Sequence, residues 1–237
     1  MITRFAGVIM QWFPVCGAGR VAWVRFDLLI LDNDGVLVDS EPIANGVLAG
    51  LLTECGHPTT YEDSVRDYLG GTLRLVREIV EPRLGRPLPE DFEARYHERL
   101  FARMRTELTI VAGVVAALDA IDLPMCVASS GTRERIETAL ATVGLLSRFD
   151  GRIFSAEDVA RGKPYPDLFL YAAERMGAEP ERCLVVEDSP HGVAAAKAAR
   201  MTVVGYAGLT PAERLTDADI VIAQMADLPQ STPLSCA

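Results

Sequence analysis

Short apolar runs separated by amphipathic stretches organise the sequence from residue 26 onward. The runs at 26–31, 123–128, 152–155, 182–186, 202–206 and 219–223 predict buried strands. Helix-period patterns lie between them, at 110–121, 133–143, 168–176 and 193–200. Strands that alternate with helices in this way predict an α/β fold.

Residues 42–108 have a different pattern, with apolar positions at helical spacing and no convincing strand. Leu48, Leu51 and Leu52 form the apolar stripe of a first helix, which should end near residues 56–58. Further helices are predicted at 61–68, 73–80 and 92–104, with a loop at 82–89. The four helices form an insertion directly after the first strand.

The first 23 residues do not share either pattern. Their apolar piece, 5–13, is broken by Pro14 and is too short to span a membrane. It is also a weak signal peptide, because only Arg4 precedes it as a basic residue and no clear small-x-small site follows. We expect residues 1–23 to be a disordered or loosely docked N-terminal extension, and a start codon assigned too early is the alternative.

Composition and charge narrow the class of protein. A chain of 237 residues with 49% hydrophobic content can bury a substantial core, and its net charge of −10 argues against a nucleic-acid partner. The five cysteines are scattered, with no pair at metal-ligand spacing, which favours free thiols. We therefore expect a cytoplasmic protein with no nucleic-acid or membrane partner, and the composition is compatible with a monomer.

Two carboxylates stand at the end of the first predicted strand. Asp32 and Asp34 are spaced i, i+2 and are followed by Gly35. In open α/β sheets, chemistry collects at the carboxyl ends of strands. Carboxylates this close repel each other, and either a cation such as Mg²⁺ or a proton on one of them relieves the repulsion. A protonated Asp34 beside an ionised Asp32 would pair a nucleophile with an acid/base group, although Asp-Asn-Asp-Gly is also a common polar turn.

Three later segments also place polar groups after predicted strands or in a Gly/Pro loop. Ser129 and Ser130 could cradle an anionic oxygen, while the same segment could simply cap the helix at 133–143. Lys163 lies in a Gly-Lys-Pro-Tyr-Pro loop, where a lysine is usually solvated. Glu187 and Asp188 follow the strand at 182–186, where Asp188 could also act only as a helix cap.

Taken in order, these segments resemble the four signatures of the haloacid dehalogenase-like superfamily. Residues 26–40 match the first signature, strand-Asp-x-Asp-Gly-hydrophobic-Leu-x-Asp-Ser, at every fixed position, and the resemblance covers roughly residues 25–228. It implies a Rossmann-like parallel sheet core, residues 24–41 and 109–237. It also implies that residues 42–108 are an inserted four-helix cap domain that closes over the active site.

The resemblance implies a role for each candidate residue. Asp32 would attack phosphorus to form an aspartyl phosphate, and Asp34 would protonate the leaving oxygen and later activate water. Lys163 would neutralise the nucleophile and the transferring phosphoryl group. Mg²⁺ would be bound by Asp32, the carbonyl of Asp34 and Asp188, with Glu187 acting through water. The implied substrate contacts are Ser129, Ser130, Gly35 and, in the cap loop, Arg74, which could instead be an ordinary solvated arginine.

The predicted function is that of a Mg²⁺-dependent phosphatase acting on a small phosphorylated metabolite, most plausibly a sugar or polyol phosphate. A β-phosphoglucomutase-like enzyme is the closest alternative. Such mutases carry a histidine where this chain has Ala44 and a lysine where it has Gly70. A 2-haloacid dehalogenase would need neither Asp34 nor Asp188. An inactive binding module is disfavoured because all the chemical positions are occupied.

Overall fold

A six-stranded parallel sheet forms the centre of the molecule. The computed structural model describes residues 26–68 and 72–231. The strand order is β5-β4-β1-β6-β7-β8. Their bounds are β1 Leu28–Leu31, β4 Met125–Ser129, β5 Ile153–Ser155, β6 Cys183–Glu187, β7 Thr202–Tyr206 and β8 Ile220–Ile222. The chain builds outward from β1 through β4 to β5 and then crosses to β6 on the other side of β1. A crevice at the carboxyl ends of β1 and β6 follows from this reversal.

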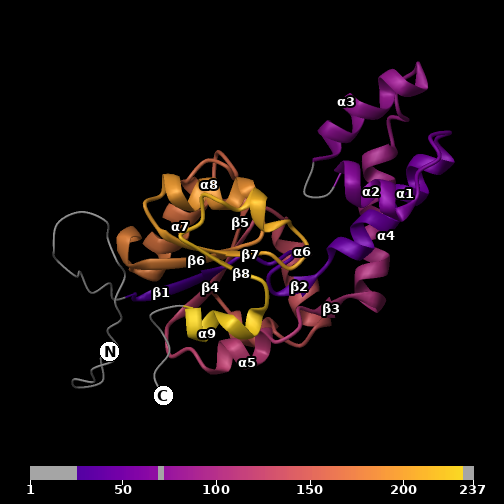
Figure 1. The fold of residues 1–237 in the computed structure, drawn as a ribbon. Coiled ribbons are helices and arrows are strands. Elements are labelled where there is room, and N and C mark those ends of the chain that lie inside the picture. The colour runs from indigo at the N-terminus through magenta and orange to yellow at the C-terminus, as the bar shows by residue number, and fades with distance from the viewer. Residues whose placement is uncertain (1–25, 69–71, 232–237) are drawn as a thin grey trace, which may run out of the picture.

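Helices cover both faces of the sheet (Figure 1). Leu29 and Leu31 of β1 pack with α5, α6 and α9 on one face, and Leu28 and Ile30 pack with α7 and α8 on the other. The helix bounds are α5 Val114–Asp119, α6 Arg133–Thr142, α7 Asp167–Met176, α8 Pro190–Ala198 and α9 Leu228–Ser231. Short 3₁₀ turns lie at η1 Leu146–Phe149, η2 Ala156–Asp158, η3 Pro180–Arg182, η4 Ala212–Arg214 and η5 Met225–Asp227. All four β1 side chains are buried because both faces are covered.

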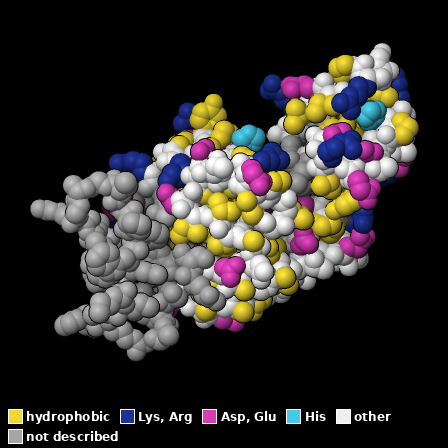
Figure 2. Space-filling model, viewed as in Figure 1, with side chains coloured by type: hydrophobic (Ala, Val, Ile, Leu, Met, Phe, Trp, Pro, Cys, Tyr) yellow, Lys and Arg dark blue, Asp and Glu magenta, His cyan; other side chains and the backbone are white. Residues whose placement is uncertain are grey.

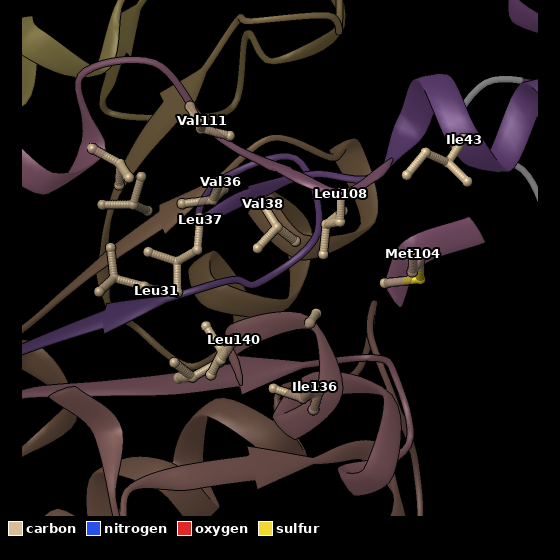
Figure 3. Packing of buried hydrophobic residues seen from close by; sticks show 14 of the residues in the cluster. Leu31, Val36, Leu37, Val38, Ile43, Met104, Leu108, Val111, Ile136 and Leu140 are labelled. Carbon is tan, nitrogen blue, oxygen red and sulfur yellow. The ribbon is translucent and has the colours of Figure 1, made fainter. Parts of the chain in front are cut away.

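Four helices stand away from the sheet as a separate group (Figure 1). They are α1 Glu41–Glu54, α2 Tyr61–Tyr68, α3 Leu73–Leu84 and α4 Phe92–Glu107. The chain leaves the core through β2, Val38–Asp39, and returns through β3, Thr109–Ile110, and these two strands pair antiparallel. One apolar cluster continues across this junction, from Ile136 and Leu140 of α6 to Ile43 and Met104 of the inserted helices (Figure 3). The predicted α/β fold with a helical insertion is confirmed, while the exact domain limits stay a prediction.

Several predicted element limits were wrong. Helix α3 continues through Pro82 to Leu84, and Gly85 ends it in the left-handed conformation at φ 66°. The predicted helix at 110–121 is shorter, because Thr109–Ile110 form β3 and α5 begins only at Val114. Pro82 lies in the last turn of α3, where it removes one backbone hydrogen bond.

Arg200 stands where a helix end favours glycine, and it adopts a φ of 63°.

Charged side chains of both signs are interspersed on the face shown in Figure 2, without a broad basic patch among the described residues there. In the part of the chain that the structure describes, every helix is too short or too polar to cross a bilayer.

Candidate active site

A cavity of about 360 Å³ opens at the carboxyl ends of β1, β4 and β6. The predicted residues Asp32, Asp34, Ser129, Ser130, Lys163, Glu187 and Asp188 all line it. The inserted helices contribute Glu41 and Thr72, and α6 contributes Arg135. Segments far apart in the sequence therefore meet where the strand order reverses.

Lys163 is held between two carboxylates. Its Nζ donates hydrogen bonds to Asp32 Oδ1 at 2.7 Å, Glu187 Oε1 at 2.6 Å and the Ala128 carbonyl at 3.0 Å. The lysine side chain is only 4% exposed. Burial alone would lower the pKa of Lys163, but Asp32 and Glu187 raise it overall, so the lysine is a cation.

Glu187 is engaged through both carboxylate oxygens. Oε1 accepts from Lys163, and Oε2 accepts from the backbone N–H and the hydroxyl of Ser189, both at 2.9 Å. A Cβ at Gly192 would lie 1.8 Å from this carboxyl group, so the helix α8 must carry glycine there. These contacts suit Glu187 to orient Lys163, and its metal contact through water stays a prediction.

Asp34 is held by two donors on one oxygen. Ser40 Oγ donates to Asp34 Oδ1 at 2.6 Å, and Arg135 Nη2 donates to the same oxygen at 2.8 Å. Burial would raise the pKa of Asp34, but Arg135 and Ser40 lower it overall. For Asp32, burial raises the pKa although Lys163 opposes the change. These directions are opposite to those expected for a protonated Asp34 beside an ionised Asp32, because Arg135 and Ser40 lower the pKa of Asp34 while burial raises the pKa of Asp32.

The site fits a hard divalent cation. Asp188 has no hydrogen-bond or ion-pair partner among the described residues, and burial, followed by Glu187 and Asp32, raises its pKa well above the usual value. A Cβ at Gly35, whose φ is 80°, would lie 2.0 Å from Asp188 Oδ2, so Asp188 lies against the backbone that follows Asp34. Asp32, Glu187 and Asp188 together exceed the positive charge of Lys163 by two. Carboxylates such as these, together with a backbone carbonyl such as that of Asp34, are the oxygen donors that Mg²⁺ prefers. No trio of His, Cys, Asp or Glu side chains within 26–68 and 72–231 has a metal-ligand arrangement, and the expected ligand set of Asp32, the Asp34 carbonyl and Asp188 stays a prediction.

The two predicted serines differ in position. Ser129 is buried at the end of β4 and its Oγ accepts from the Gly131 N–H at 3.3 Å, whereas Ser130 is exposed. Thr132 caps α6 by accepting from the Arg135 N–H, so the cradle and helix-cap interpretations of this segment hold together. Gly35 lies next to Asp188 and lines a neighbouring cavity, so its expected substrate contact stays a prediction.

Arg74 is not brought to the cavity. Its side chain is 86% exposed and pairs with Glu78, one turn further along α3, at 2.8 Å. Thr72, the N-cap of the same helix, lines the cavity instead. This exposure matches the alternative of an ordinary solvated arginine, and the expected substrate contact of Arg74 stays a prediction. Gly70, the position used against a mutase, lies outside the described residues.

Several cavity residues were missed from the sequence, and Glu41 and Arg135 are two of them. Glu41 lies directly after the first motif, and its carboxylate accepts a hydrogen bond from Asn45. Arg135 lies three residues after the helix cap Thr132, on the turn nearest to the β4 end. The signal available in the sequence was that Glu41 and Arg135 each lie next to a motif that ends at the cavity.

Comparison with known proteins places the chain among hydrolases. The haloacid dehalogenase-like hydrolase family matches residues 26–200. The 6-phosphogluconate phosphatase of Escherichia coli is 31% identical over 71% of this chain and 76% of its own length. The validoxylamine A 7'-phosphate phosphatase of Streptomyces hygroscopicus is 30% identical over 86% of this chain and 96% of its own.

A solved structure agrees with this assignment. The haloacid dehalogenase-like protein of unknown function from Agrobacterium tumefaciens is 41% identical and superposes with a TM-score of 0.81, covering 86% of this chain and 96% of its own. Because the named relatives are phosphatases, the predicted enzyme class, a phosphoric monoester hydrolase, is confirmed at the level of the family. With motifs, fold and relatives in agreement, the chain belongs to the haloacid dehalogenase-like hydrolase family.

Proposed function

We propose that the chain is a Mg²⁺-dependent phosphatase that hydrolyses a small phosphorylated metabolite, a sugar or polyol phosphate, through an aspartyl phosphate. The observation that carries the proposal is the convergence of Asp32, Asp34, Lys163 and Asp188 on one cavity. Both phosphatase relatives described above are named for small phosphorylated metabolites. The polar lining from Glu41 and Ser130 suits a leaving group that carries hydroxyls.

The chemistry takes two steps. An Asp32 oxygen attacks phosphorus, and the bond from phosphorus to the ester oxygen breaks. Because Arg135 and Ser40 lower the pKa of Asp34 in the free site, Asp34 must first take up a proton from solvent, which it then gives to the leaving oxygen. Water then attacks the aspartyl phosphate, Asp34 takes the proton, the bond from phosphorus to Asp32 breaks, and inorganic phosphate leaves. Because Lys163 binds Asp32 Oδ1, Oδ2 is the oxygen available for attack.

Positive charge must balance the phosphoryl group in both steps. Lys163 is charged and adjacent to the nucleophile, and Ser129 is at the strand end where a phosphoryl oxygen would bind. Mg²⁺, held by Asp32, the Asp34 carbonyl and Asp188, would supply further charge that favours the approach of two anions. Without Mg²⁺, the single positive charge of Lys163 would face three carboxylates, those of Asp32, Glu187 and Asp188.

A mutase is disfavoured by one described residue. At the position of the mutase histidine, Ala44 packs against the apolar cluster and offers no polar group. The methyl group of Ala44 cannot couple closure of the inserted helices to proton transfer, as a histidine could. Water should then reach the aspartyl phosphate before a returning sugar hydroxyl does.

Activity measurements test the proposal directly. Purified protein is screened against hexose, pentose and polyol phosphates with Mg²⁺, and free phosphate is measured. Asp32→Asn should abolish turnover without changing the circular dichroism spectrum, and EDTA should inhibit the wild type. Asp119→Asn is the control, because this aspartate is surface-exposed and pairs only with Arg148 among the described contacts.

Three results would contradict the proposal. Near-normal turnover by Asp32→Asn would exclude an aspartyl phosphate on this residue. Release of halide from 2-haloacids in the presence of EDTA would indicate a dehalogenase. Accumulation of glucose 6-phosphate from β-glucose 1-phosphate faster than free phosphate would indicate a mutase.

We also propose a cytoplasmic monomer. Cys55, Cys126 and Cys183 are free and buried, which suits a reducing compartment. Light scattering after gel filtration should give the mass of one chain, and a dimer mass would contradict this part.

A further inference from the structure

The guanidinium of Arg135 reaches the acid/base candidate from a distant part of the chain. Arg135 and Asp34 are separated by 101 positions, and Nη2 lies 2.8 Å from Oδ1. Both side chains line the cavity, and each is 21% exposed. Arg135 is thus part of the cavity wall rather than a surface arginine.

The hydrogen bonds to Asp34 divide its two oxygens. Ser40 and Arg135 both donate to Oδ1, and neither hydrogen bond reaches Oδ2; the side chain of the neighbouring Asn33 adds a weaker interaction that also lowers the pKa of Asp34. Of the two, Oδ2 is therefore free to exchange a proton with a bound molecule. Rotation of the carboxylate would be costly, because both charge-assisted hydrogen bonds would break.

The two donors are attached to different parts of the fold. Ser40 is the N-cap residue of α1, where the inserted helices begin. Arg135 belongs to α6, whose Ile136 and Leu140 are fully buried against the sheet side of the apolar cluster. Its backbone N–H is also bound by the cap residue Thr132. Arg135 therefore ties Asp34 to the rigid core.

We propose that Arg135 is a positioning residue that fixes Asp34 for the hydrolysis of the aspartyl phosphate. This inference rests on the proposed function. In that step a water oxygen bonds to phosphorus and its proton passes to Asp34 Oδ2. The bond from phosphorus to the Asp32 oxygen breaks, its electron pair returns to Asp32, and inorganic phosphate leaves. Loss of Arg135 lets the carboxylate rotate away from the water.

A substrate with a good leaving group separates this step from the first one. From p-nitrophenyl phosphate, p-nitrophenolate leaves without a proton, so formation of the aspartyl phosphate does not need Asp34. Hydrolysis of the intermediate still needs it. The ratio kcat/KM reports only the first step, while kcat includes the second.

The experiment compares Arg135→Met, Arg135→Lys and the wild type with p-nitrophenyl phosphate and Mg²⁺. Arg135→Met should lower kcat by about 10- to 100-fold with kcat/KM nearly unchanged. Stopped-flow traces should show a burst of about one p-nitrophenolate per active site, followed by the slow steady state. Arg135→Lys, which keeps a cationic donor, should recover part of kcat. Arg148→Met removes an exposed arginine–aspartate pair and should change nothing.

A structural role gives a different result. A parallel fall of kcat and kcat/KM without a burst, or an unchanged kcat, would overturn the inference. Should Arg135→Met fail to fold, Arg135→Lys must still lower kcat at constant kcat/KM. A wild type without turnover, or full turnover by Asp32→Asn, would instead overturn the proposed function.

Discussion

Replacement of Lys163 by methionine tests the charge balance at the centre of the site. The substitution keeps a long apolar side chain near Phe169, whose ring centroid lies 4.8 Å from Nζ. It removes the hydrogen bonds to Asp32, Glu187 and the Ala128 carbonyl. The side chains of Asp32 and Glu187 are 9% and 1% exposed, so they would be left as buried carboxylates without a cation.

The magnitude follows from that burial. Removal of one partner from a buried ion pair costs about 3–5 kcal/mol of the free energy of unfolding. For a chain of this size, each kcal/mol lowers the melting temperature by about 2–4 °C. We therefore expect a fall of about 6–20 °C at neutral pH in metal-free buffer.

The pH dependence has a definite sign. Burial already raises the pKa of Asp32 to about 7 although Lys163 lowers it, so loss of Lys163 raises the pKa of Asp32 further above its unfolded value of about 4, and the folded state binds more protons between the two values. Stability is then lost as pH rises, and the deficit of Lys163→Met should shrink as pH falls toward about 4. Urea unfolding followed by circular dichroism, at several pH values with EDTA, measures it.

A double-mutant cycle provides the control. Glu187→Gln should destabilise the wild type, but it should restore about 1–3 kcal/mol to Lys163→Met, because it removes a buried charge. The reasoning fails if Lys163→Met costs less than about 1 kcal/mol, if the deficit is independent of pH, or if Glu187→Gln gives no recovery.

Two further predictions concern the metal side of the cavity. Asp188→Asn should raise the melting temperature of the metal-free protein, because the buried carboxylate with the raised pKa is gone. In the wild type, the Asp188 carboxyl lowers the stability of the metal-free protein as pH rises above about 4. Mg²⁺ at a hundredfold excess over Kd should add about 2.7 kcal/mol to the free energy of unfolding. Asp188→Asn should lose this gain. Thermal scans with and without Mg²⁺ measure both, and a retained Mg²⁺ response would count against Asp188 as a ligand. Gly35→Ala should cost at least about 1–3 kcal/mol and weaken the Mg²⁺ response, because φ is 80° and the new Cβ would lie 2.0 Å from Asp188 Oδ2. Gly50→Ala is the control, because Gly50 is an exposed helical position where the added Cβ meets open space. It should stabilise the protein by roughly 0.5–1 kcal/mol. Equal effects of Gly35→Ala and Gly50→Ala would refute the steric argument.

The sequence predicts those site residues that directly follow a strand. Asp32 and Asp188 are placed by local patterns, because the carboxyl ends of parallel strands share one edge of the sheet. Arg135 is different, since its contact with Asp34 depends on the rotational phase of α6 relative to a loop that lies 101 positions earlier. No local pattern encodes that phase.

The wrong element limits also have physical causes. Strands β2 and β3 have two residues each, which is too short for an alternating pattern to appear. Pro82 suggested a helix end, but the left-handed Gly85 three residues later is the actual C-cap. Arg74 was assigned from its position in the chain, although Glu78 lies four residues further along the predicted helix at 73–80, at the spacing of the ion pair that the structure contains.

The β2–β3 pairing makes the inserted helices exchangeable in principle. Since Asp39 faces Thr109 across the ribbon, the insertion leaves and re-enters the core at one point. A segment whose two ends already touch adds almost no new closure constraint to the remaining chain, whatever its length. Insertions of other sizes or sequences at this point could therefore present different walls to the substrate without shifting the register of β1 against β4 and β6. Substrate choice and phosphoryl chemistry are, on this geometry, separately adjustable parts of one chain.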